Sequence, residues 1–208
     1  ILNGVNTGKF NRDTSDNDKI KNELKIAPGS VVIGTVSVFR SQKRLTKWLE
    51  IAYNIHKKNP DTYFIIIGDG PLRDEIHIRA NELEMHNYLH FAGLQEDVIP
   101  YYKSMDIFMM ASEFEGLPIA LLEAMSMECI PCCTRAGGIQ EVIEHEKDGF
   151  LVETDMPMLL IDVVSDLLQN WERRAGSLKQ AARKKVEKDF SLQRMVNELE
   201  HIYISLNS

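Results

Sequence analysis

The sequence predicts an α/β domain built on a six-stranded, parallel, doubly wound sheet. Six short apolar runs are spread along the chain, and each is followed by a segment in which apolar residues recur at helical spacing. The runs are continuous rather than alternating, which is typical of parallel strands buried on both faces. With 208 residues, 44% of them hydrophobic, the chain is long enough for one domain with its own core.

The predicted elements alternate along the chain. Strands are expected at residues 31–36, 63–67, 88–91, 107–110, 130–134 and 149–152. Helices are expected at 45–56, 72–84, 96–105, 118–127 and 137–144, and from 156 to the end with a break at 189–191, where Ser191 would cap the final helix. The polar stretch 11–25 is predicted to be a mobile linker or an exposed loop. Because such sheets bind ligands at the carboxyl ends of their strands, the candidate loops are 37–44, 68–71, 92–96, 111–117 and 135–138.

Charge and composition exclude several classes of function. The net charge is −7 and no basic face stands out, so no nucleic-acid partner is expected. The charge also disfavours a strongly anionic membrane as partner of this segment, and no apolar run approaches the roughly 20 residues of a membrane-spanning helix. No signal peptide is visible, and because the chain opens at Ile1 without a Met we interpret it as a fragment whose targeting signals lie elsewhere.

The sequence gives no sign of a metal site. Of the six histidines, His86 and His90 are four residues apart, but they straddle the start of the strand expected at 88–91 and do not share one helix face. No Asp-x-Asp pair follows a strand to hold a divalent cation. Cys129 and Cys132 have the spacing of a redox or metal pair, but with Cys133 they belong to a short apolar run that is typical of a buried strand. We favour a structural role, in which each cysteine acts as a small hydrophobe. An odd cysteine count without paired spacing fits a reducing cytoplasm.

The most informative stretch runs from Glu115 to Glu123 and contains Gly116 and Pro118. Proline is tolerated only in the first turn of a helix, so the helix should begin at Pro118, with Glu115 in the preceding loop and Glu123 one to two turns in. Free N–H groups at the helix start suit a phosphate, and a carboxylate beyond them suits sugar hydroxyls. The pattern predicts a pocket for a sugar attached to a phosphate; a first-turn acid and a solvated helix glutamate are the simpler alternative.

Three further turns carry candidate binding residues. Arg40 and Lys43 follow the first strand and could clamp a diphosphate, although a solvated basic turn is the common alternative. The turn with Gly68 and Gly70 lacks the third glycine of a dinucleotide fingerprint, yet its missing Cβ atoms permit close approach by a ligand. The Gly-Gly turn within 135–138 is equally an anion site or an ordinary strand–helix turn.

In sum, these motifs resemble the retaining glycosyltransferases of the large family 4, which have the GT-B fold. The resemblance covers nearly the whole chain and rests on six motifs in order, namely residues 1–6 with Phe10, Lys43, residues 68–72, Phe91 with Gly93, Glu115 with Glu123, and residues 137–141. It implies the Rossmann-like C-terminal half of such an enzyme. Residues 1–25 would then be the interdomain linker and the start of the domain, 26–190 the donor-binding domain, and 191–208 a helix that crosses back to the N-terminal domain.

The resemblance also implies roles for individual residues. Glu123 would bind the ribose hydroxyls, Glu115 would face the transferred sugar, and Lys43 with an arginine would neutralise the diphosphate. Backbone groups would hold the sugar and phosphates at Gly116, Leu117 and Ile119, and would contact the base at Gly93 and Leu94. The family often carries Gly-Arg shortly before the lysine, where this chain has Ser37 and Val38. We expect Arg40 to take the place of that arginine, and no metal cofactor to be needed.

The implied reaction moves a hexose from a nucleoside-diphosphate sugar to an acceptor hydroxyl with retention, and Glu115 acts as an electrostatic and hydrogen-bonding group. The acceptor, a glycan or lipid-linked sugar, would bind mainly to the missing N-terminal domain, so the fragment should catalyse little. The enzyme would be cytoplasmic, associating with the inner membrane face only through that missing half. Alternatives are a nucleotide-sugar epimerase of GT-B fold, a non-catalytic nucleotide-binding module, and a nicotinamide-dependent oxidoreductase, which the incomplete glycine fingerprint disfavours.

Overall fold

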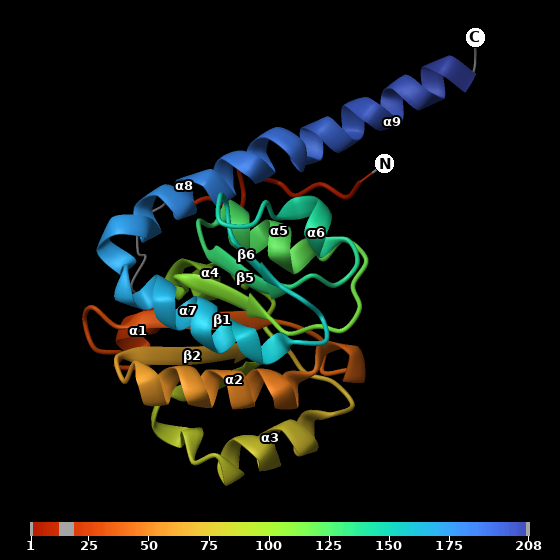
Figure 1. Cartoon of the computed structure of the whole chain (residues 1–208). Coiled ribbons are helices and arrows are strands. Elements are labelled where there is room, and N and C mark those ends of the chain that lie inside the picture. The colour runs from red at the N-terminus through yellow and green to blue at the C-terminus, as the bar shows by residue number, and fades with distance from the viewer. Residues whose placement is uncertain (1, 13–18, 207–208) are drawn as a thin grey trace.

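The computed structural model describes residues 2–12 and 19–206 of the chain. Six parallel strands form one sheet in the order β3-β2-β1-β4-β5-β6 (Figure 1). Their bounds are Val31–Val36 (β1), Thr62–Ile67 (β2), Leu89–Gly93 (β3), Ile107–Met110 (β4), Ile130–Thr134 (β5) and Phe150–Val152 (β6). The predicted six-stranded, doubly wound parallel sheet is confirmed. The strand order reverses between β1 and β4, so the loops after these two strands flank the crevice where such sheets bind ligands.

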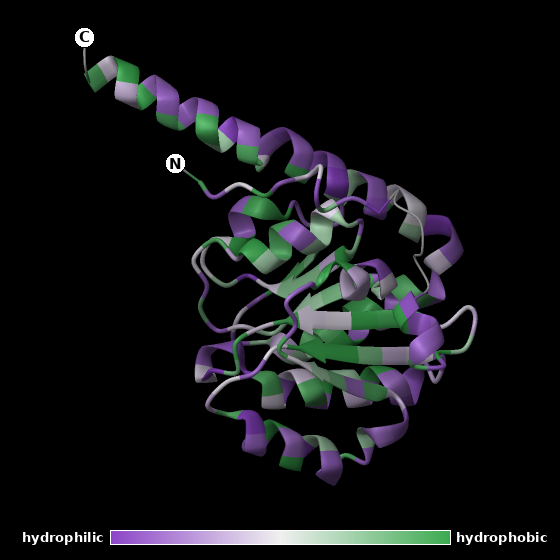
Figure 2. Cartoon of the chain, turned by 180° about the vertical axis from the view of Figure 1, so that it is seen from behind, coloured by the Kyte–Doolittle hydropathy of each residue, from purple (hydrophilic) through white to green (hydrophobic). Residues whose placement is uncertain are grey.

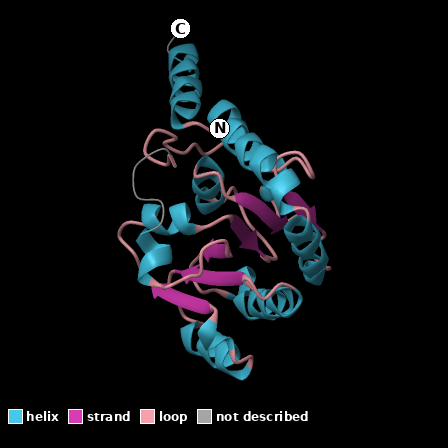
Figure 3. Ribbon diagram, turned by 90° about the vertical axis from the view of Figure 1, so that its left-hand side faces the viewer, coloured by secondary structure: helices cyan, strands magenta, loops and turns pink. Residues whose placement is uncertain are grey.

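The helices cover both faces of the sheet (Figure 3). One core lies between the sheet and α2, α3 and α7, and the other between the sheet and α1, α4, α5, α6 and the second half of α8. The bounds are Lys19–Glu23 (α1), Leu45–Lys58 (α2), Arg73–Glu82 (α3), Ile99–Ser104 (α4), Ile119–Ser126 (α5), Ile139–Val142 (α6), Leu160–Gln169 (α7), Trp171–Asp189 (α8) and Leu192–Leu206 (α9). Burial on both faces explains the apolar sequences of the inner strands, whereas only Leu89 is buried in the edge strand β3.

Several helix boundaries differ from the prediction. Pro118 is extended, with φ −73° and ψ 117°, so α5 begins one residue later, at Ile119. The helix expected at 137–144 is a single turn, because Gly138 precedes it and Ile143 is already extended. The final helix does begin after Ser191, whose hydroxyl oxygen accepts a hydrogen bond of 3.4 Å from the backbone N–H of Arg194, as expected of an N-cap.

The stretch 11–25 is not simply an exposed loop. Its described part contains α1, whose Ile20 is 5% exposed, and Arg12 donates hydrogen bonds to the backbone oxygens of Lys103 and Met105. Residues 13–18 of the predicted linker lie outside the described residues. Composition alone did not identify this short helix, because one apolar anchor among polar residues gives no periodic pattern.

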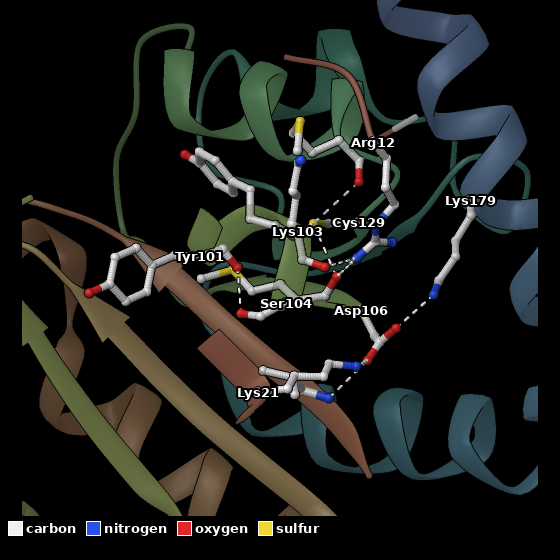
Figure 4. A network of polar contacts seen from close by, with 12 residues as sticks. Arg12, Lys21, Tyr101, Lys103, Ser104, Asp106, Cys129 and Lys179 are labelled. Atoms are coloured by element: carbon white, nitrogen blue, oxygen red, sulfur yellow. Dashed lines mark hydrogen bonds and ion pairs between the residues drawn. The ribbon is translucent and has the colours of Figure 1, made fainter. Parts of the chain in front are cut away.

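Asp106, just before β4, ties distant elements together at the amino edge of the sheet (Figure 4). Its carboxylate lies 2.7 Å from Nζ of Lys179 on α8 and 3.4 Å from Nζ of Lys21 on α1, and accepts a 3.1 Å hydrogen bond from the N–H of Val32 on β1. Burial opposes ionisation of this side chain, but the two lysines outweigh it, and the pKa of Asp106 is lowered.

Helix α9 extends away from the body of the domain (Figure 1), and hydrophobic and hydrophilic residues are interspersed along it (Figure 2). None of its described residues is buried, and Ile202, Tyr203 and Ile204 are between 46% and 68% exposed. The N-terminal segment runs beside its start, because the backbone of Val5 bonds to Phe190 and Leu192 at 2.9 and 2.8 Å. Among the described residues, no helix is both long enough and apolar enough to cross a membrane.

We expect Asp106→Asn to lower the free energy of unfolding at pH 7 by about 1–3 kcal/mol, because it removes a largely buried charge that pairs with two lysines. A lowered carboxyl pKa stabilises the fold above the ordinary value of 3.8. This contribution is lost as the pH falls through the lowered pKa of the folded state. Urea unfolding of both proteins between pH 7 and pH 3 would therefore show the difference shrinking only at the acidic end.

The matched control is Asp162→Asn, since Asp162 pairs with Lys58 at the surface and its side chain is 72% exposed. Such a pair contributes about 0–1 kcal/mol, so the control should change stability little. An Asp106→Asn effect no larger than the control's would contradict the structural role assigned to Asp106.

Candidate functional site

The loop after β1 brings a cluster of cations to the carboxyl edge of the sheet. Ser41–Lys43 forms one 3-10 turn, and Arg44 follows in the left-handed region with φ 46°. The Arg44 guanidinium donates hydrogen bonds to the backbone oxygens of Ala111 and Ser112 at 2.8 and 2.9 Å, and to that of Thr154 at 3.0 Å. Arg44 therefore anchors this loop to those after β4 and β6, while Arg40, at the start of the turn, is exposed.

Lys43 and Glu115, 72 positions apart, meet in an ion pair. Nζ of Lys43 lies 2.6 and 2.7 Å from the two carboxylate oxygens, and Oγ of Ser112 donates a 2.6 Å hydrogen bond to Oε1. The side chains of Lys43 and Glu115 are 19% and 8% exposed. Two predicted site residues thus lie together, one from each loop flanking the reversal of strand order.

Sequence reasoning missed Ser112. It is buried, and its backbone oxygen also accepts a 2.6 Å hydrogen bond from the Thr134 hydroxyl on β5. The available signal was its position directly after β4 and three residues before Glu115, in the same loop. A hydroxyl at that spacing can bond to a carboxylate that follows it.

The Gly-Gly turn supports the loop that carries Glu115. A Cβ atom on Gly137 would lie 1.9 Å from the backbone oxygen of Glu115, and one on Gly138 would lie 2.2 Å from that of Gly116. The N–H of Gly138 donates a 3.3 Å hydrogen bond to the Glu115 oxygen. Of the two interpretations left open for this turn, the structure favours close backbone packing over an anion site, because this N–H already has an acceptor.

The stretch between the two glutamates is open. Gly116 is exposed, and a Cβ atom there would meet nothing within 4 Å. Ile119, the first residue of α5, is 50% exposed, and the backbone oxygen of Leu117 accepts a 3.3 Å hydrogen bond from the Asn3 side chain. No side chain of the described residues caps the start of α5, so its first N–H groups remain able to bind an anion.

Glu123 lies one turn into α5 and is held differently from Glu115. Its Oε2 accepts a 2.9 Å hydrogen bond from the hydroxyl of Tyr102 on α4. Burial raises the pKa of Glu123, and the Tyr102 hydrogen bond and the charge of Lys9 oppose that rise without cancelling it. Glu123 is thus a partly buried carboxylate bound by a neutral donor.

A pocket of about 240 Å³ lies at the carboxyl ends of β2 and β3. It is lined by Phe39, Gly68, Asp69, Arg73, His77, Phe91, Ala92 and Gly93. The rings of His77 and Phe91 lie 4.0 Å apart at an angle of 30°, and Leu94, just beyond, is 78% exposed. The pocket has the aromatic wall and open mouth that suit a flat ring, and the two predicted base-contacting positions, Gly93 and Leu94, lie in it or next to it.

Gly68 and Gly70 serve the packing of neighbouring loops. A Cβ atom on Gly68 would lie 1.9 Å from the backbone oxygen of Ser37, and one on Gly70 would lie 2.6 Å from the backbone nitrogen of Phe39. Only Gly68 also lines the pocket. The glycine turn therefore lets the loop after β1 approach closely, and this contact helps to shape the pocket wall.

The three cysteines are buried, and the described residues form no cluster of metal ligands. Cys129, Cys132 and Cys133 are all buried, and burial raises the pKa of the Cys129 thiol to about 12, which keeps it protonated. Their burial agrees with the structural role predicted for them. In the described part of the chain, no three His, Cys, Asp or Glu side chains are grouped so that they could hold a metal ion.

Comparisons with known proteins address the family directly. The family described as "Glycosyl transferases group 1" matches residues 16–185. The Escherichia coli UDP-Gal:alpha-D-GlcNAc-diphosphoundecaprenol alpha-1,3-galactosyltransferase is 28% identical, over 99% of this chain and 54% of its own length. The N-acetyl-alpha-D-glucosaminyl L-malate synthase of Bacillus anthracis is 30% identical, over 93% of this chain and 50% of its own length. The chain thus spans about half the length of these two curated relatives.

Solved structures give the same fold. Anabaena HepE in complex with UDP superposes with a TM-score of 0.88 at 21% identity, over 99% of this chain and 57% of that one. The C-terminal domain of the group 1 glycosyl transferase LpcC from Francisella tularensis has a TM-score of 0.79 at 26% identity, over 91% of this chain and all of that one. The match over residues 16–185 covers most of the chain and confirms the family that the motifs predict: the chain belongs to the group 1 glycosyl transferases.

Proposed function

We propose that this chain is the donor-binding half of a retaining glycosyltransferase that moves a hexose from a nucleoside-diphosphate sugar to an acceptor hydroxyl. The observation that carries the proposal is the meeting of Lys43 and Glu115 beside the open start of α5. Structures of HepE are described with UDP and with UDP-glucose, and the E. coli relative is named for a UDP-galactose donor. These names support a uridine nucleotide as the first ligand to test.

The geometry suggests how the donor would bind. The diphosphate would take Lys43 as its counter-ion, and the first N–H groups of α5 would receive phosphate oxygens. Lys43 would then leave Glu115, whose carboxylate would retain the Ser112 hydrogen bond and turn one oxygen toward hydroxyls of the sugar. The base would enter the pocket at Gly93, and Glu123 would accept hydrogen bonds from the ribose.

No metal is required in this scheme. Phosphate leaving groups need positive charge in the transition state, which fixed cations and helix N-termini can supply. In this chain Lys43, Arg40 and the start of α5 would supply it. Glu115 would stabilise positive charge on the sugar as its bond to the phosphate breaks, and the departing diphosphate would accept the proton of the acceptor hydroxyl.

The acceptor would be bound mainly by another part of the enzyme. The E. coli relative is named for a diphosphoundecaprenol-linked sugar, and this chain spans 54% of its length. An acceptor glycan or lipid-linked sugar is therefore our expectation here. The exposed apolar side chains of α9 would pack against the other half, as expected for residues 191–208, and the isolated chain should bind nucleotide weakly and catalyse little.

We expect Lys43→Ala to weaken UDP binding about 10- to 100-fold, because a charge-assisted hydrogen bond contributes about 1.5–3 kcal/mol. Calorimetric titration of the folded chain with UDP measures the change. Lys47→Ala is the matched control, since Lys47 lies nearby on α2 but pairs with Glu50 at 2.6 Å. Equal loss in both variants would count against a diphosphate site at Lys43.

Arg40→Ala should weaken UDP more than uridine, because the guanidinium is expected to contact the diphosphate alone. Arg173→Ala, which changes an exposed arginine on α8, serves as control. If Lys43→Ala binds UDP more weakly but Arg40→Ala binds it as tightly as the wild type, Arg40 is not part of the site. In that case Arg40 does not replace the arginine of the family motif.

Glu115→Gln should separate binding from transfer. Losing the carboxylate charge frees Lys43, so UDP affinity should rise about 2- to 5-fold, which corresponds to about 0.4–1 kcal/mol. Transfer by the whole enzyme should fall by about 100-fold or more, because a preorganised group that stabilises developing charge is lost. Donor isomerisation without acceptor, assayed in the unmodified whole enzyme, would instead point to an epimerase.

A further inference from the structure

We propose that Tyr102 is a positioning residue for the donor site: it holds one oxygen of Glu123 so that the other is presented to the ribose hydroxyls. This inference rests on the proposed function, because it assumes that Glu123 binds a ribose. It assigns a role to a residue on α4, on a different helix from Glu123.

The Tyr102 side chain is fixed by its surroundings. It is fully buried, and its ring lies edge-on to Phe10 at 6.2 Å and tilted against Phe108 at 6.1 Å. From this position the hydroxyl reaches α5, where it lies 2.9 Å from Oε2 of Glu123 and 3.2 Å from the backbone oxygen of Ala120. A phenol carries one proton, and the shorter contact to a charged oxygen is the stronger of the two.

One of the two carboxylate oxygens of Glu123 accepts a hydrogen bond from the protein. Oε2 is bound to Tyr102, and no hydrogen bond among the described residues reaches Oε1, although Glu123 is only partly buried. A carboxylate oxygen that no donor of the described residues reaches is well suited to accept hydrogen bonds from hydroxyl groups of a ligand. Fixing Oε2 leaves the carboxylate little freedom to rotate, so the direction of Oε1 is set in advance of binding.

A purely structural role for the contact explains less. A buried tyrosine needs a partner for its hydroxyl, and the Ala120 oxygen already offers one. Burying a carboxylate beside it opposes ionisation, and the pKa of Glu123 is raised for that reason. The groups that face Glu123 and favour its charged form are Tyr102 from α4 and Lys9 from the N-terminal segment. The Tyr102 hydrogen bond therefore offsets part of the cost of burying the Glu123 carboxylate. The packing of Tyr102 alone does not require that carboxylate, because the Ala120 oxygen can accept a hydrogen bond from its hydroxyl.

The test is Tyr102→Phe, which keeps the ring and removes only the hydroxyl. UDP should bind about 3- to 10-fold more weakly, while the 2′,3′-dideoxy analogue of UDP, which lacks both ribose hydroxyls, should be nearly unaffected. As the pH is lowered, the preference for UDP over the analogue should disappear at a higher pH in the variant than in the wild type. The Tyr102 hydrogen bond lowers the pKa of Glu123, so without it the carboxylate becomes protonated at a higher pH.

The control is Tyr63→Phe, which removes the hydroxyl of a half-buried tyrosine on β2 and should leave both ligands unaffected. An equal loss for UDP and the analogue in Tyr102→Phe would overturn the proposal, since it would mean that Tyr102 only supports the fold. If the wild-type chain binds no nucleotide, or if Lys43→Ala binds UDP as tightly as the wild type, the proposed function itself fails, and this inference fails with it.

Should Tyr102→Phe not fold, 3-fluorotyrosine at position 102 provides a second probe. It keeps the hydroxyl and nearly the same volume, and as a stronger acid it donates a stronger hydrogen bond. UDP should then bind more tightly by about 2-fold with no change for the analogue, in line with the strength of such bonds. Identical UDP affinity would contradict the proposal.

Discussion

The carboxyl edge of this domain is organised around one buried carboxylate. Glu115 is 8% exposed, and a carboxylate removed from water is costly unless it is paired and hydrogen-bonded. Lys43 and Ser112 meet both needs, and each requires its own support. The guanidinium of Arg44 fixes the loop that carries Lys43, and the Gly-Gly turn lets the backbone of the Glu115 loop approach the end of β5. The need to stabilise the buried Glu115 carboxylate thus accounts for Lys43, Ser112, Arg44 and the Gly-Gly turn at this edge.

The two glutamates are held in ways that divide their work. Glu115 is paired with a cation, so its charge is largely neutralised until an anion competes for that cation. Glu123 is bound by a neutral phenol instead of a cation, and burial raises its pKa. In the proposed scheme, a phosphate would replace Glu115 as the partner of Lys43, whereas neutral hydroxyls would approach Glu123. In the scheme proposed above, this difference would orient a nucleotide sugar along α5, with its phosphates toward Lys43 and its ribose toward Glu123.

The sequence was informative where a pattern was local or motif-based. Continuous apolar runs predicted all six strands, because parallel strands covered on both faces are largely apolar. Lys43, Glu115 and Glu123 were identified from motifs, and the structure brings the first two together. Ser112 and Tyr102 were missed, since a buried serine or tyrosine looks like any core residue until its partner in three dimensions is known. Helix α1 was missed for a similar reason, because Ile20 and Lys21 act through contacts with residues far along the chain.

Strand β4 connects stability with the candidate site. Asp106 precedes it and binds α1, α8 and β1, while Ser112 and Glu115 follow it at the opposite edge of the sheet. Its four strand residues are all buried, so the strand cannot shift without disturbing both cores. The position of Ser112, and through it the orientation of Glu115, is therefore set by a strand whose other end is fixed by two ion pairs. A rigid strand of this kind suits a site that must hold a charged group in place for a ligand. Asp106 at one edge of the sheet can therefore support Glu115 at the other edge without touching it.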